Sequence, residues 1–190
     1  DAFLFGVAAR YEDFSDFGTT FDGKISARMI LNGLLTLRGS VSTGFKAPTV
    51  GQSNVVNVTT AFAANGLEDQ ATLPPTNPIS MQLGATPLRP EESLNSSLGI
   101  VGEIAKQFYF TLDYFNIKLD DRISTTSALQ LSQEDIQTLV AAGITEASSY
   151  GSAKYFTNDF DTTTQGIDLV VNYETYLLNI PSRVMLTYNW

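Results

Sequence analysis

Apolar and polar residues alternate with a period of two along most of this chain. In the clearest stretch, residues 165–174, the odd positions from Ile167 to Tyr173 are apolar, and only Val170 interrupts the small and polar even positions. Successive side chains of a β-strand point to opposite faces, so the alternation predicts strands with one apolar and one polar face. Such stretches lie at residues 2–11, 22–31, 34–45, 93–104, 107–119, 165–174 and 183–190.

The connections between these stretches are alternately short and long. Short turns are predicted at Asn32-Gly33, a dipeptide that favours a type I′ hairpin, at Ala105-Lys106 and at Asn179-Ile180-Pro181. Long connections run over residues 46–90 and 120–153. Outer-membrane barrels keep tight turns on the periplasmic side and longer loops outside the cell, so both long connections are predicted to be extracellular.

Two local features modify this picture. The second long connection contains one predicted short helix, with Ser132 as its N-cap, Asp135 three residues later and Gly143 as its stop. In the stretch 107–119 the apolar positions change parity at Phe115. A β-bulge, or burial of the upper part of the strand under a loop, would explain that change.

A soluble β-sandwich also alternates, with its apolar faces packed sheet against sheet, so a soluble carbohydrate-binding module is one alternative. Against it, the stretches are about ten residues long, as a tilted membrane-crossing strand requires, rather than the usual five or six. Aromatic residues also gather at stretch ends, as in interfacial girdles. They are Tyr11, Phe45, Phe108, Tyr173 and Trp190.

We therefore predict an all-β fold: an antiparallel up-and-down transmembrane β-barrel segment of about seven strands, with long extracellular loops, one of which carries a short helix. A bacterial single-chain barrel has at least eight strands and an even number of them. We accordingly expect residues 1–190 to be part of a larger barrel domain, truncated at both ends.

Composition narrows the functions that this chain can have. Only 16% of its residues are charged, against roughly 25% in soluble domains. The net charge of -9 repels phosphate backbones, which argues against nucleic-acid binding. The chain has no His and no Cys, which removes imidazole and thiol chemistry. The carboxylate pairs Glu91-Glu92 and Asp120-Asp121 are interpreted as solvated charges, so no enzyme activity, catalytic residue, cofactor or metal is predicted.

Four segments resemble the β-barrel of TonB-dependent receptors. Residues 44–48 read GFKAP, which is similar to the Gly-Phe-Lys/Arg-Ala-Pro motif that ends a barrel strand before an external loop in that family. Residues 88–93 read LRPEES and resemble the family's Leu-Lys-Pro-Glu-x-Ser strand opening. The other two segments follow in the family's order. They are FTLDYF at 110–115, continuing to DRI at 121–123, and TQGIDL at 164–169.

The resemblance implies active uptake of a scarce ligand across the outer membrane of a Gram-negative bacterium. Family cargoes include siderophores, cobalamin, haem and oligosaccharides. It further implies contact with outer-membrane lipid, a barrel of about 22 strands filled by an N-terminal plug, and energy from the TonB–ExbB–ExbD system through that plug. This sequence shows no plug and only about seven strands. A passive porin-like or adhesin barrel is a further alternative.

Strand parity turns several polar residues away from the predicted lipid face and towards a barrel lumen. We expect these residues to contact the plug or the ligand, the alternative being a wall that contacts only water. They are Arg28, Arg38, Asn95, Asp168, Asn172 and Glu174.

Overall fold

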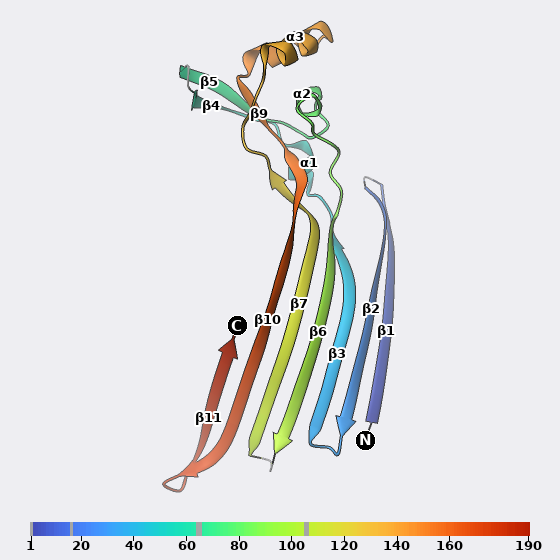
Figure 1. Cartoon of the computed structure of the whole chain (residues 1–190), viewed down its shortest axis with the longest axis vertical. Helices are drawn as coiled ribbons and strands as arrows, with labels where there is room; N and C mark the ends of the chain where they lie inside the picture. The colour runs from blue at the N-terminus through green and yellow to red at the C-terminus, as the bar shows by residue number, and fades with distance from the viewer. Residues whose placement is uncertain (1, 16, 64–65, 105–106) are drawn as a thin grey trace. The chain divides into compact units, whose positions relative to one another are not determined.

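The structure of the chain is a computed structural model, which describes residues 2–15, 17–63, 66–104 and 107–190 (Figure 1). The chain divides into two compact units. The first, called the wall here, comprises Asp1–Phe45, Glu92–Asp120 and Asp161–Trp190. The second, called the loop unit, comprises Lys46–Glu91 and Asp121–Phe160. The turn predicted at Ala105-Lys106 lies outside the described residues.

The wall is a seven-stranded sheet in the order β1-β2-β3-β6-β7-β10-β11. Adjacent strands in this sheet are also successive in the chain once the loop unit is set aside, which is the up-and-down order predicted from the sequence. The strands are β1 (Ala2–Phe14), β2 (Gly18–Leu31), β3 (Leu35–Lys46), β6 (Glu91–Ile104), β7 (Phe108–Thr125), β10 (Phe156–Leu177) and β11 (Ile180–Asn189). The predicted fold class is confirmed.

Two tight turns of the wall show the left-handed backbone that type I′ hairpins require. Asn32 and Gly33 have φ values of 52° and 67°, as the dipeptide predicts. The last hairpin turns at Leu178 and Asn179, with φ values of 51° and 65°. It therefore turns earlier than the predicted Asn179-Ile180-Pro181 segment. Pro181 lies inside β11 instead, and proline is tolerated there because β11 is an edge strand of the described sheet.

The apolar face of the wall is open to its surroundings. Leu98, Ile25 and Val41 are 64%, 54% and 51% exposed. The soluble-sandwich alternative required this face to pack against a second sheet, which such exposure contradicts. No helix in the described part of the chain is long and apolar enough to cross a membrane.

The parity change in β7 does not come from a bulge in its pairing with β6. The register between β6 and β7 runs without interruption from Glu92 opposite Asp120 to Ile104 opposite Phe108. Phe115 therefore keeps the parity of the polar face, and its ring lies against Gly166 of β10, where an added Cβ would come 2.7 Å from it. The bulge prediction is wrong for this pairing, and the glycine accommodates an aromatic side chain on the polar face.

The loop unit contains its own small sheet, in the order β4-β5-β9-β8, with β5 and β9 parallel. The first long connection contributes α1 (Val50–Asn54), β4 (Asn57–Ala63), β5 (Gly66–Thr72) and α2 (Pro78–Gln82). The second contributes β8 (Leu129–Gln130), α3 (Gln133–Ala141), the 3-10 helix η1 (Thr145–Ser149) and β9 (Ser152–Lys154). Their shared core consists of Ala71, Leu73, Ile79, Leu131, Leu139, Ala147 and Ala153.

The predicted helix is confirmed as α3. The Ser132 hydroxyl accepts a hydrogen bond from the Asp135 backbone N–H at 3.1 Å, and the Asp135 carboxylate accepts one from the Ser132 backbone N–H at 3.1 Å. Gly143 follows the helix with a φ of 90°. The Asp135 carboxylate also accepts hydrogen bonds from the Ser132 hydroxyl and the Gln82 amide, and the three contacts lower the pKa of Asp135.

Candidate functional site

The polar face of the wall carries an ion pair that crosses a whole strand. Arg38 of β3 donates from Nε and Nη2 to the two carboxylate oxygens of Asp113 of β7, at 3.0 and 2.6 Å. Strand β6 lies between them, and its Gly99 is opposite Asp113. A Cβ at Gly99 would collide with the Asp113 carboxylate and come 2.9 Å from Arg38 Nε. Because Gly99 has no side chain, it leaves room for the ion pair between Arg38 and Asp113.

Two more predicted residues have cross-strand partners at the other end of the sheet. The Glu174 carboxylate accepts hydrogen bonds from Nε and Nη2 of Arg183, at 3.1 and 2.6 Å. The Asp168 carboxylate accepts one from the Asn189 amide. The β10–β11 register pairs Glu174 with Arg183 and Asp168 with Asn189. These carboxylates are therefore already engaged within the wall.

The remaining predicted residues are less constrained. Asn95 donates from Nδ2 to the Ser93 hydroxyl at 3.2 Å, within its own strand. Arg28 lies opposite Arg38 in the register, and Asn172 lies opposite Met185. Among the residues that the structure describes, neither Arg28 nor Asn172 has an ion pair or a side-chain hydrogen bond. These two side chains are the ones available to an external group.

All six predicted residues lie on one face of the sheet. Arg28 and Arg38 are cross-strand neighbours, and Arg38 contacts Asp113. Asn95 has the parity of Gly99, which lies opposite Asp113. Phe115, with the parity of Asp113, contacts Gly166, which has the parity of Asp168, Asn172 and Glu174. The partners Asp113 and Arg183 were not among the predicted site residues. Their parity is visible in the sequence, but their pairing needs the register.

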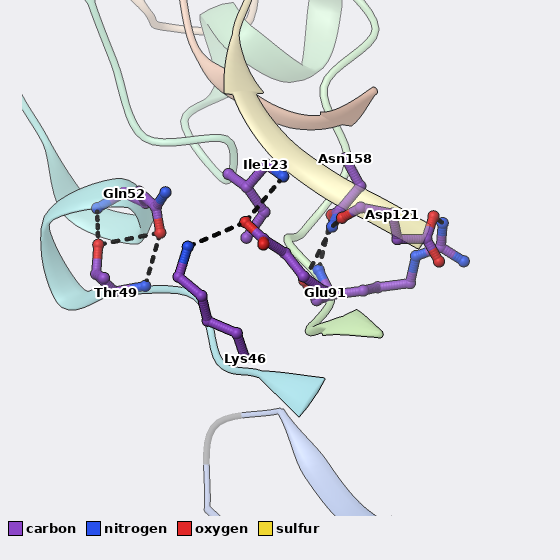
Figure 2. A network of polar contacts seen from close by, with 8 residues as sticks. Lys46, Thr49, Gln52, Glu91, Asp121, Ile123 and Asn158 are labelled. Carbon is purple, nitrogen blue, oxygen red and sulfur yellow. Dashed lines mark hydrogen bonds and ion pairs between the residues drawn. The ribbon is translucent and has the colours of Figure 1, made fainter. Parts of the chain in front are cut away.

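A second cluster of polar contacts joins the ends of the two segments of the loop unit (Figure 2). The Glu91 side chain, only 9% exposed, accepts hydrogen bonds from Lys46 Nζ and the Ile123 backbone N–H, both at 3.2 Å. The Glu91 carboxylate thus connects its own segment with those of Lys46 and Ile123. The interpretation of Glu91 as a solvated charge is wrong, because its carboxylate is engaged with a cation and a backbone donor.

Asn158 makes the matching connection beside it. Its Nδ2 donates to the carbonyl oxygens of Arg89 and Asp121 at 2.9 and 2.6 Å, and its Oδ1 accepts from the Arg89 N–H at 2.9 Å. Arg89 Nη2 also pairs with the Asp121 carboxylate at 2.7 Å. We call these contacts of Glu91 and Asn158 the polar clamp. Lys46 and Glu91 come from the two motifs GFKAP and LRPEES, so the clamp brings the two motifs together.

The chemistry of these clusters is that of binding and positioning. No group of three or more Asp or Glu side chains in the described part of the chain is arranged to hold a metal ion. In the loop unit, burial raises the pKa of Tyr155, whose hydroxyl donates to the Leu83 carbonyl at 2.9 Å. That contact again joins the two segments of the loop unit.

Comparison with known proteins gives one family. The family model described as TonB dependent receptor-like, beta-barrel, matches residues 1–190. No curated protein sequence matches the chain significantly. Among solved structures, the siderophore receptor PirA from Pseudomonas aeruginosa is similar with a TM-score of 0.63 and 16% identity, over 98% of this chain and 31% of that one.

Two other solved structures share the fold. PirA from Acinetobacter baumannii has a TM-score of 0.60 and 18% identity, over 90% of this chain and 23% of that one. The RagAB peptide importer has a TM-score of 0.59 and 13% identity, over 98% of this chain and 20% of that one. The chain therefore spans less than a third of the length of each of these three proteins.

Proposed function

The chain belongs to the TonB-dependent receptor-like β-barrel family, and on that premise we propose that it is part of an outer-membrane receptor for active ligand uptake. Its family is one of receptors and not of enzymes. The observation that carries the proposal is a seven-stranded up-and-down sheet with one exposed apolar face and one polar face. Such a sheet is stable where lipid covers the apolar face and water or a plug covers the other.

In this proposal the two long connections lie outside the cell and capture the ligand. The loop unit supports that role, because residues of both connections form one hydrophobic core. A shared core holds the two connections in a defined conformation, which a ligand-binding surface requires. The ligand class that we propose is a siderophore, since two of the similar structures are named as siderophore receptors. Cobalamin, haem and oligosaccharides are the other candidates within the family.

We place the polar face towards the lumen, where a plug that couples the barrel to TonB would lie. Arg28 and Asn172 are then the best candidates for contacts with plug or ligand, because their side chains have no partner among the described residues. Arg38, Asp168 and Glu174 have a structural role in the wall, since each is bonded to another strand of the sheet. Within the described residues, the Asn95 side chain is bonded to Ser93 of its own strand and to no other strand, so it can still turn towards the lumen.

The first test concerns the wall. The purified chain is examined by analytical ultracentrifugation and circular dichroism, in buffer and in detergent micelles. We expect aggregation in buffer and β-structure in micelles. A monomeric, cooperatively folded protein in plain buffer would contradict the membrane assignment.

The second test concerns uptake. A strain that lacks the complete gene is grown on a panel of ferric siderophores as sole iron source, with and without TonB. We expect growth on at least one siderophore that requires both the gene and TonB. Growth that requires the gene but not TonB would favour the passive porin alternative.

A further inference from the structure

A shallow hollow on the polar face of the wall has a floor of small residues, with Leu4 and Phe5 also among its lining residues. Its floor is one row across four strands: Ser26 lies opposite Gly6 and Ser40, and the Ser40 and Ser97 hydroxyls are 2.9 Å apart. A Cβ at Gly6 would come 2.9 Å from the Ser26 hydroxyl, so glycine keeps this floor low. The hollow has a volume of about 430 Å³, and Lys24, Arg28 and Arg38 are among its lining residues.

The charges around this hollow are not balanced within the wall. Arg28 lies directly opposite Arg38, and like charges at opposed positions of antiparallel strands are unfavourable. Asp113 neutralises Arg38 with both of its carboxylate oxygens. Lys24 lies on the other side of the row, two residues before Ser26, and like Arg28 it has no ion pair among the described residues.

Two other carboxylates on this face, Asp22 and Glu12, lie near Arg10, and none of the ion pairs of the described residues joins either of them to Lys24 or Arg28. Asp22 lies opposite Arg10 in the register, and Glu12 accepts a hydrogen bond from Arg10 Nη2 at 2.5 Å. The hollow itself therefore presents hydrogen-bond donors: a guanidinium, an ammonium group and serine hydroxyls. A planar fork of N–H donors with hydroxyls beside it suits a carboxylate group, which only accepts.

We propose that Lys24, Arg28 and the serine floor form a binding site for a carboxylate. This inference rests on the proposed function in one respect, since the polar face must line the interior of the complete barrel. The carboxylate then comes from one of two sources. It is either an acidic side chain from another part of the complete protein, or a carboxylate of a small-molecule cargo.

The test uses the complete protein in detergent, with citrate as the probe. Three variants are compared with the unmodified protein: Arg28→Gln, Lys24→Gln and the control Arg10→Gln. Arg10 lies on the same face, but its charge is already paired with Glu12. Citrate affinity is measured by calorimetric titration, and the midpoint of thermal unfolding is measured for each variant without citrate.

A cargo site predicts that the unmodified protein binds citrate and that Arg28→Gln weakens binding by about tenfold, with Lys24→Gln acting in the same direction. An internal carboxylate predicts no citrate binding, and a lower unfolding midpoint in Arg28→Gln and Lys24→Gln than in Arg10→Gln. The proposal is overturned if both site variants match Arg10→Gln in affinity and in unfolding midpoint.

Failure of the site can be told apart from failure of the proposed function. Membrane fractionation of cells that produce the same proteins reports whether the receptor reaches the outer membrane. A protein found in the outer membrane whose site variants behave like Arg10→Gln would overturn the carboxylate site alone. A protein found elsewhere would overturn the proposed function, while the titration of the purified protein would still decide the site.

Discussion

The wall and the loop unit obtain their stability from different sources. The fully buried side chains of a hydrophobic core belong to the loop unit, where residues such as Ile79 and Ala153 are 0% exposed. In the wall, by contrast, large apolar side chains such as Leu98 and Leu186 are 64% and 58% exposed. The loop unit buries its apolar surface within itself, whereas the wall leaves its apolar surface for another medium to cover.

This difference shows that two sheets of one chain can be stabilised in different ways. In the wall, hydrogen bonds between strands connect a single layer, and in the proposed function lipid covers its apolar face. In the loop unit, two connections without regular periodicity fold together because each supplies half of a core. Four predictions test this difference between the two units.

The largest effect is expected in the core of the loop unit. Ile79→Ala removes a fully buried side chain from α2 and is expected to destabilise the loop unit by about 2–5 kcal/mol. Hydrogen exchange of the complete protein in detergent should become faster throughout the loop unit and remain unchanged in the wall. The matched control is Met81→Ala, since Met81 lies in the same helix and is 55% exposed. Equal effects of the two substitutions would disprove a shared core.

A charge on the apolar face tests the wall. Leu186→Arg is expected to destabilise the folded protein in lipid vesicles by about 2–4 kcal/mol if Leu186 lies near the bilayer centre, measured by denaturant unfolding. Thr187→Arg, one residue further along β11 on the polar face, should have much less effect. Similar losses for both variants would mean that lipid does not cover the face that carries Leu186.

The polar clamp is expected to contribute less than the core. Asn158→Ala removes three hydrogen bonds, to the Arg89 N–H and to the carbonyls of Arg89 and Asp121, and should destabilise the loop unit by about 1–3 kcal/mol. Limited proteolysis should then cut both long connections faster. Asn54→Ala is the control, because Asn54 makes a single exposed contact with Val50. Faster cleavage of only one connection would show that the clamp does not join them.

The smallest effect is a pH dependence at the start of α3. Hydrogen bonds from the Ser132 and Gln82 side chains lower the pKa of Asp135 below its usual value of 3.8. The stabilisation is therefore complete above that value and is lost as the pH falls through the lowered pKa. Exchange protection of α3 should fall on acidification in the unmodified protein and change less in Asp135→Asn. Glu134→Gln, at the exposed neighbouring position, should behave like the unmodified protein.

The sequence predicted several local features of both units but missed the helix starts at Thr49 and Asn77. Alternation gave the strands of the wall and their two faces, Asn32-Gly33 gave its hairpin, and Ser132 with Asp135 gave the start of α3. Each of these depends on residues only a few positions apart. In the first long connection the strands β4 and β5 have seven residues each, which is too short for a sustained alternation. They were accordingly not predicted.

Which side chains share a face can thus be predicted from the sequence, because parity follows from the geometry of the extended backbone. Which residues contact one another is known only from the folded chain, since those contacts depend on register and on packing between distant segments. Arg38 and Asp113 are 75 positions apart, and Gln70 and Ser152 in the parallel β5–β9 pairing are 82 positions apart. No local pattern specifies such partners, because a shift of register would preserve the pattern of each strand and change every contact between strands.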